Sequence, residues 1–217
     1  MTHRTKPCSR GLRVAGARNP RGSLRDMSVG GPEAFPAAIY RPQAPRRVVL
    51  LPGARYPTRA PLLWFAREVA VARGFGVLEV LDEPPAGVDP FAWGRDRAQR
   101  ALEHEPSALD VVIGKSLSSD VADLAADRGL PAIWLTPLLD RQGILAALAR
   151  TPRPTLLVGG TADPTWRPDA LPDNVMLDRL ELDGLDHGLQ LPGDPQASLA
   201  ALRKVVRKVD RFLGALR

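Results

Sequence analysis

The sequence has few of the residues on which several classes of protein depend. Its single cysteine, Cys8, lies in a polar and basic segment. This excludes an intramolecular disulfide and a cysteine metal cluster, and it weighs against a cysteine nucleophile. No apolar run approaches the roughly 20 residues that a membrane-spanning helix needs. Only three histidines occur in 217 residues, so a histidine acid or base has few candidates.

The excess of positive charge is confined to one end of the chain. Residues 1–26 hold seven of the 30 basic residues and one of the 24 acidic residues, so the net charge of +6 belongs to this segment and the rest is neutral. The basic residues of the segment are Arg4, Lys6, Arg10, Arg13, Arg18, Arg21 and Arg25. A neutral body gives no electrostatic reason to expect a nucleic-acid partner.

Residues 1–26 also lack hydrophobic periodicity, and we expect them to form a disordered basic tail. The segment has neither the apolar core of a secretory signal nor the apolar face of a transit peptide. A misplaced start, with Met27 as the first natural residue, is the alternative to a real disordered arm. The remaining residues, 27–217, predict one domain of a cytoplasmic protein without membrane association.

From residue 37 onward, short apolar runs alternate with longer amphipathic stretches. The pattern predicts strands at 46–53, 74–81, 109–113, 132–135, 155–159 and 174–182, and helices at 62–73, 90–103, 118–128 and 141–150. A last helix is predicted to present one apolar face made of Leu199, Leu202, Val206, Val209, Leu213 and Leu216. Continuously apolar strands separated by helices indicate a single-domain α/β fold, with a mostly parallel sheet covered on both faces.

A serine, an acid and a histidine each follow a predicted strand. Ser116 lies in Gly-Lys-Ser-Leu-Ser at 114–118, Asp163 ends Gly-Gly-Thr-Ala-Asp, and His187 ends Asp-Gly-Leu-Asp-His. Ligands of parallel sheets bind outside the carboxyl ends of the strands, so we expect these three residues to meet there. Their chain order is the one found in α/β-hydrolases and differs from that of other serine hydrolase folds.

These residue types in this order predict nucleophilic catalysis. Ser116 would be the nucleophile, His187 would take its proton, and Asp163 would orient the imidazole. The other histidines lie in the tail (His3) and at the end of a polar helix (His104). The backbone amide of Leu117 is predicted to stabilise an oxyanion, and Asp186 is a rival for the orienting acid.

The chain from about 37 to 216 resembles the α/β-hydrolase superfamily. The segments VVIGKSLSS, LLVGGTADPTW and LELDGLDHGLQLPGD are similar to small bacterial hydrolases related to the dienelactone hydrolases, and LLPGARY is similar to the oxyanion loop of the family. The resemblance implies the amide of Ala54 as the second oxyanion donor, with Arg55 as the neighbouring alternative. Two departures are Ser118, where glycine is usual, and the sequence at 51–53, where many members carry His-Gly.

Residues 136–155 leave room for one helix, so no lid domain is expected over the site. Candidate wall residues are Arg55, Tyr56, Trp93, Trp134 and Trp166, of which Trp134 fits the core equally well. Substrate contacts are assigned to Arg55, Tyr56 and Trp166. Lys115 precedes Ser116 as in a phosphate-binding loop, but Leu109 stands where that motif needs glycine. We therefore expect Lys115 to be a solvated residue at the rim.

The predicted activity is hydrolysis of a small carboxylic ester through an acyl-serine intermediate, with no cofactor and no metal ion. A lactone or a thioester is an equally compatible substrate, and the oligomeric state stays open. The alternative from another class is a non-catalytic binding or scaffold protein with the same fold. A third alternative is a nucleic-acid-binding protein that uses the basic tail.

Overall fold

An eight-stranded sheet forms the centre of the computed structural model, which describes residues 24–29 and 35–216. The strands are β1 (Leu24–Val29), β2 (Phe35–Tyr40), β3 (Arg46–Leu51), β4 (Gly76–Val80), β5 (Leu109–Lys115), β6 (Ala132–Leu135), β7 (Thr155–Gly160) and β8 (Leu177–Leu182). Their order across the sheet is β1-β2-β4-β3-β5-β6-β7-β8. The strands from β3 to β8 run parallel, whereas β1 and β2 are antiparallel to their neighbours. The predicted α/β architecture with a mostly parallel sheet is confirmed.

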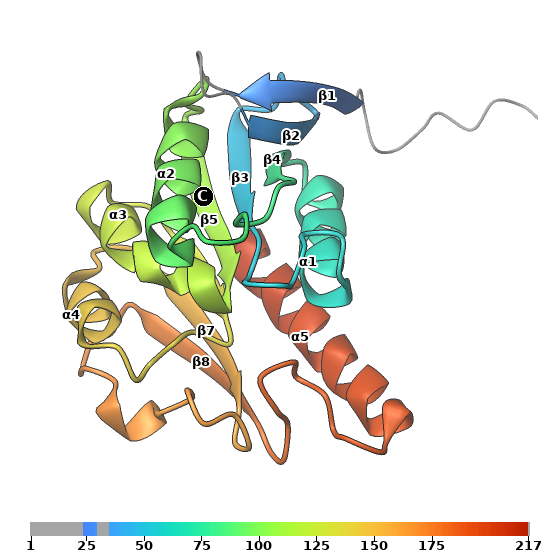
Figure 1. Ribbon diagram of the computed structural model, residues 1–217, viewed down its shortest axis with the longest axis vertical. Helices are drawn as coiled ribbons and strands as arrows, with labels where there is room; N and C mark the ends of the chain where they lie inside the picture. The colour runs from blue at the N-terminus through green and yellow to red at the C-terminus, as the bar shows by residue number, and fades with distance from the viewer. Residues whose placement is uncertain (1–23, 30–34, 217) are drawn as a thin grey trace, which may run out of the picture.

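Helices cover both faces of this sheet (Figure 1). They are α1 (Pro61–Ala72), α2 (Pro90–Glu103), α3 (Ala122–Asp127), α4 (Gln142–Arg150) and α5 (Pro195–Ala215), with short 3-10 helices η1 (Ser116–Val121) and η2 (Pro168–Ala170). Helices α1 and α5 lie on one face, and α2, α3 and α4 lie on the other. Alternate residues of β3 enter the two cores: Val48 and Leu50 pack towards α1 and α5, and Val49 and Leu51 pack towards the opposite helices.

Most predicted elements match the structure; the differences lie at β1 and β2 and in the helix predicted at 118–128. Strands β1 and β2 were not predicted, and β1 begins at Leu24, inside the segment expected to be a disordered tail. Residues 1–23 of that predicted tail lie outside the described residues. The helix predicted at 118–128 is instead the 3-10 helix η1 followed by α3. Between β6 and β7 the chain forms α4 alone, in agreement with the space expected for one helix.

The predicted apolar face of the last helix was partly wrong. The buried residues of α5 are Ala201, Val205, Val209, Phe212 and Leu213. Leu199 is 60% exposed, and Leu202 lies at the margin of the core. The buried face of α5 begins at the small residue Ala201, whereas the predicted face began two residues earlier, at the larger Leu199.

The strand order reverses between β3 and β5. The chain passes from β3 through α1 to β4 on one side, and then crosses through α2 to β5 on the other side. The carboxyl ends of β3 and β5 are adjacent, because Leu51 pairs with Gly114. Loops that leave such a switch point in opposite directions open a crevice at the sheet edge. The segments that begin at Pro52 and Ser116 therefore start side by side at this edge of the sheet.

Candidate active site

The turn after β5 holds Ser116 in a conformation that is unusual for its residue type. Its φ is 50°, in the left-handed region, which costs a non-glycine residue about 1–3 kcal/mol and is concentrated at functional sites. The turn is tight, because a Cβ on Gly114 would lie 2.8 Å from Cβ of Ser118 and 3.0 Å from the Trp134 ring. Glycine at 114 is therefore a packing requirement of the turn that presents the Ser116 hydroxyl.

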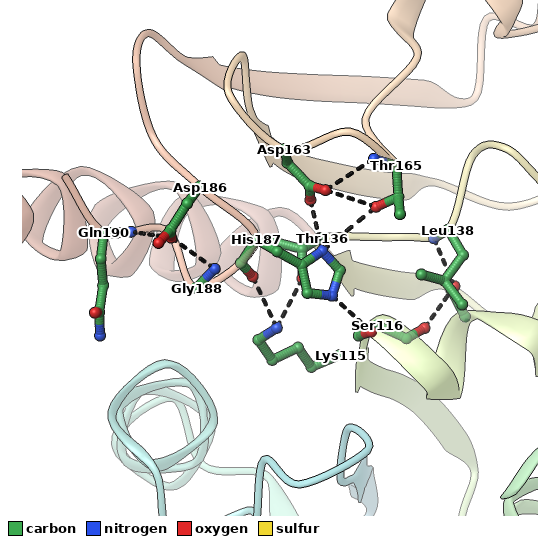
Figure 2. A network of polar contacts seen from close by, with 11 residues as sticks. Lys115, Ser116, Thr136, Leu138, Asp163, Thr165, Asp186, His187, Gly188 and Gln190 are labelled. Carbon is green, nitrogen blue, oxygen red and sulfur yellow. Dashed lines mark hydrogen bonds and ion pairs between the residues drawn. The ribbon is translucent and has the colours of Figure 1, made fainter. Parts of the chain in front are cut away.

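The structure brings Ser116, His187 and Asp163 together in one hydrogen-bonded series (Figure 2). The Ser116 hydroxyl lies 2.7 Å from Nε2 of His187, and Nδ1 of His187 lies 2.7 Å from Oδ2 of Asp163. The Asp163 side chain is fully buried, whereas 37% of the His187 side chain is exposed. The series therefore runs from a buried carboxylate to a partly exposed histidine and serine.

Asp163 is fixed by a second residue that the sequence analysis missed. The backbone amide and the hydroxyl of Thr165 both donate to Oδ1 of Asp163, at 2.9 Å and 2.8 Å. Burial raises the pKa of Asp163, but hydrogen bonds from His187 and Thr165 outweigh burial, and the pKa stays below its ordinary value. Asp163 is thus a carboxylate beside the imidazole at neutral pH. The spacing Asp-Pro-Thr, typical of an Asx turn, was the available sequence signal.

Asp186, the rival acid, is engaged elsewhere. Its Oδ1 accepts hydrogen bonds from the backbone amides of Gly188 and Gln190, at 2.8 Å and 2.9 Å. Asp186 therefore shapes the loop that carries His187, and Asp163 is the acid that contacts the imidazole (Figure 2).

The loop after β3 forms a tight turn beside Ser116. Gly53 and Tyr56 close it through paired backbone hydrogen bonds of 2.9 Å and 3.2 Å, which leaves Ala54 and Arg55 exposed at its tip. Arg55 has a φ of 54°. Leu117 lies in the first turn of η1, where backbone amides have no partner within the helix. The two amides predicted as oxyanion donors therefore come from the two sides of the switch point.

Two serines after Ser116 tie the turn to its surroundings. Ser118, which stands where glycine was expected, donates a hydrogen bond to the carbonyl of Pro52 in the facing loop. Ser119 donates to the carbonyl of Ser116 at 2.7 Å and accepts from the amide of Leu138 at 3.1 Å. Both side chains are buried. The polar residues of this segment thus fix the turn, and only Ser116 presents its hydroxyl to His187.

The predicted wall residues lie at different depths. Arg55 is exposed and Tyr56 is half-buried, with its hydroxyl accepting from the amide of Leu62 at 3.1 Å. Trp134 belongs to the core with 1% exposure. Trp93 and Trp166 are each 6% exposed, and the Trp166 ring packs so closely on Gly159 that a Cβ there would lie 2.1 Å away. Of the three residues assigned to substrate contact, only Arg55 and Tyr56 offer substantial surface.

The expectation that Lys115 is solvated was wrong. Lys115 is 2% exposed rather than solvated at a rim, and its ammonium donates to Oγ1 of Thr136 at 2.9 Å and to the carbonyl of His187 at 3.0 Å. The sequence around Lys115 gave no signal of burial, because the pattern cannot show which segments close over a side chain.

Within residues 24–29 and 35–216, no cluster of three or more His, Cys, Asp or Glu side chains is arranged to hold a metal ion. The helices in this part of the chain are all too short or too polar to cross a lipid bilayer.

Comparison with solved structures decides the fold. No protein-family model and no curated protein matches the chain. A dienelactone hydrolase from Anabaena variabilis superposes with a TM-score of 0.69, at 20% identity, over 88% of this chain and 97% of the other. The protein has the α/β-hydrolase fold.

Two further solved structures share this α/β-hydrolase fold. A Pyrococcus furiosus esterase covers 93% of the chain and 97% of its own length, with 14% identity and a TM-score of 0.65. A predicted CIB-like hydrolase from Thermoplasma acidophilum covers 89% of the chain and 99% of its own length, with 13% identity and a TM-score of 0.65. Each aligns over nearly its whole length, so the neighbours share the complete fold and not a fragment of it.

Proposed function

We propose that the protein is a serine hydrolase that cleaves small carboxylic esters, lactones or thioesters through an acyl-serine intermediate. The observation that carries this proposal is the continuous series from Asp163 through His187 to the Ser116 hydroxyl, with both contacts of His187 at 2.7 Å. A serine hydroxyl is a weak nucleophile at neutral pH until a neighbouring base takes its proton. The series supplies that base and the carboxylate that orients it.

In the proposed mechanism, Oγ of Ser116 attacks the carbonyl carbon while Nε2 of His187 takes the hydroxyl proton. Asp163 holds the Nδ1 proton of His187 and stabilises the imidazolium that forms. The imidazolium then gives its proton to the leaving alcohol or thiol, and the acyl group stays on Ser116. A water molecule, deprotonated by His187, attacks the acyl group and releases the carboxylic acid.

The amides of Leu117 and Ala54 are proposed to bind the oxyanion of each tetrahedral intermediate. Both lie at the switch point between β3 and β5, and the hydrogen bond from Ser118 to Pro52 fixes the two segments relative to one another. Donors held in this way cost no reorganisation during the reaction, and each typically contributes about 2.7–4 kcal/mol to transition-state stabilisation.

The surroundings support small substrates. Ser116 and His187 are partly exposed, and the chain between β6 and β7 forms only α4, so no inserted domain from that segment covers them. Arg55 and Tyr56, on the loop after β3, are the proposed substrate contacts. A dienelactone hydrolase and an esterase among the structural neighbours are consistent with this substrate class.

The test is covalent labelling with a fluorophosphonate probe. The wild type should gain one adduct at Ser116, whereas Ser116→Ala should gain none. Ser107→Ala is the matched control: Ser107 hydrogen-bonds Asp110 near the amino end of β5, at the opposite sheet edge, and this variant should label like the wild type. A folded wild type that is never labelled would favour a binding or scaffold protein. Hydrolysis of p-nitrophenyl acetate, a thioester and a lactone then separates the substrate classes.

A further inference from the structure

Lys115 is a buried charge that the proposed reaction does not use. It is the last residue of β5, directly before Ser116, and it is 2% exposed. Lysines are almost never buried to this extent unless their ammonium group is satisfied by other groups. A lysine placed here therefore needs a reason beyond packing.

The ammonium group of Lys115 joins the segments that build the site. It donates to Oγ1 of Thr136, after β6, and to the backbone carbonyl of His187, in the loop after β8 (Figure 2). Its Nζ also lies 4.7 Å from the ring centre of Tyr56, in the loop after β3. The ammonium thus makes two hydrogen bonds, to a hydroxyl and a carbonyl, and a cation–π contact with an aromatic ring.

The contact with His187 is the one that concerns catalysis. The Lys115 ammonium binds the backbone carbonyl of His187, and the imidazole of His187 contacts Ser116. Lys115 itself directly precedes Ser116 in the chain. The Lys115 side chain therefore connects the backbone of His187 with the chain segment that carries Ser116. Thr136, the second acceptor, has a φ of 47° and is fully buried, so its hydroxyl is held in place.

We propose that Lys115 is a positioning residue whose charged ammonium holds the His187 backbone so that the imidazole stays in hydrogen-bonding distance of Ser116. This inference rests on the proposed function. Lys115 does not touch the substrate in this scheme; it acts through His187.

The charged groups around Lys115 make this role dependent on pH. Burial lowers the pKa of Lys115 to about 8, although Asp163 and Asp186 raise it. Of the other groups that face it, Tyr56 has its pKa raised by burial and stays neutral at this pH, and Asp163 stays ionised because its own pKa is lowered. Loss of the Lys115 proton removes one donor and the charge, and the hold on His187 weakens.

The expected result is a decline of activity above pH 8 that unfolding does not explain. The folded state binds this proton less tightly than the unfolded state, whose lysine titrates near 10.5. The Lys115 contribution to the free energy of unfolding therefore rises, rather than falls, between about pH 8 and pH 10.5. Activity and stability should move in opposite directions over this interval.

The experiment measures the fluorophosphonate labelling rate of the full chain from pH 6 to pH 10, with thermal unfolding at each pH. For the wild type we expect a loss of rate centred near pH 8. Lys115→Met should label about 10²-fold more slowly at pH 7, the loss typical of a reacting group displaced by about 1 Å, and should show no further decline in alkali. With p-nitrophenyl acetate, the loss should fall on kcat rather than on KM.

Thr136→Val keeps the proposal testable if Lys115→Met does not fold. It removes one acceptor from the ammonium and should shift the alkaline decline to lower pH. Thr155→Val is the matched control, because Thr155 is equally buried but lies at the amino end of β7; its profile should match the wild type. A wild-type rate that stays flat up to pH 10, or a folded Lys115→Met with the wild-type rate and profile, overturns the role of Lys115. Absence of wild-type labelling at every pH instead overturns the proposed function.

Discussion

Gly160, the last residue of β7, packs against Leu185 in the loop that carries His187. A methyl group added at Gly160 should therefore push this loop away from Asp163. A Cβ at this position would lie 2.2 Å from the carbonyl oxygen of Leu185 and 2.7 Å from its carbonyl carbon. The same oxygen accepts a 3.0 Å hydrogen bond from the amide of Ala162. The obstacle is backbone and not a flexible side chain, so relief requires the loop before His187 to move.

The displacement can be estimated from these contacts. Ordinary contacts of a Cβ begin near 3.4 Å, so Leu185 must retreat by about 1 Å, and His187 lies two residues further along the same loop. A misplacement of about 1 Å typically costs 10²-fold in rate. Overpacking adds about 1–3 kcal/mol of destabilisation, which lowers the melting temperature of a domain of this size by roughly 5 °C.

Gly160→Ala should therefore slow fluorophosphonate labelling of Ser116 by about 10²-fold, together with the loss of melting temperature. Gly143→Ala in α4 is the control, because nothing lies within 4 Å of the Cβ it would gain. That variant should label at the wild-type rate and gain about 0.5–1 kcal/mol from the lower flexibility of the unfolded chain. If Gly160→Ala is labelled at the wild-type rate and melts at the wild-type temperature, close packing of Gly160 on Leu185 does not set the position of His187.

Two further predictions concern buried carboxylates. Asp163→Asn should lower kcat for p-nitrophenyl acetate by about 10³–10⁴-fold, because a neutral amide stabilises neither the required tautomer nor the imidazolium; a loss below tenfold would remove Asp163 from the mechanism. The hydrogen bonds that lower the pKa of Asp163 stabilise the folded state above about pH 4, and this stabilisation is lost as the pH falls through the folded pKa. Asp163→Asn should therefore lose less stability in acid than the wild type. Arg67→Met should cost about 3–5 kcal/mol in urea unfolding, because the fully buried Glu79 loses the partner that lies 3.0 Å away. The double variant Arg67→Met, Glu79→Leu should recover most of that loss. If Arg67→Met alone unfolds at the same urea concentration as the wild type, the ion pair does not contribute to stability.

The sequence was most informative where local pattern and topology agree. The apolar runs at 132–135 and 155–159 matched β6 and β7 to within one residue, because a strand buried on both faces must be apolar throughout. Strand β1 was missed because it pairs antiparallel at the sheet margin, where mixed residues are tolerated. Strand β2 is apolar but contains Pro36, a residue that argues against a strand. The face of α5 was misjudged because large side chains were weighted above Ala201.

The pattern of the sequence was enough to predict the α/β architecture and to place Ser116, Asp163 and His187 at one sheet edge. Periodicity defines the strands, and the carboxyl ends of parallel strands coincide in space. The surroundings of these residues emerged only from the three-dimensional packing: Asp163 and not Asp186 contacts the imidazole, Thr165 holds Asp163, and Lys115 is buried against the backbone of His187. These contacts join segments that are distant in the chain, and their geometry follows from how loops close over one another. No local pattern records that closure, so a lysine that looked solvated became the residue on which our further inference rests.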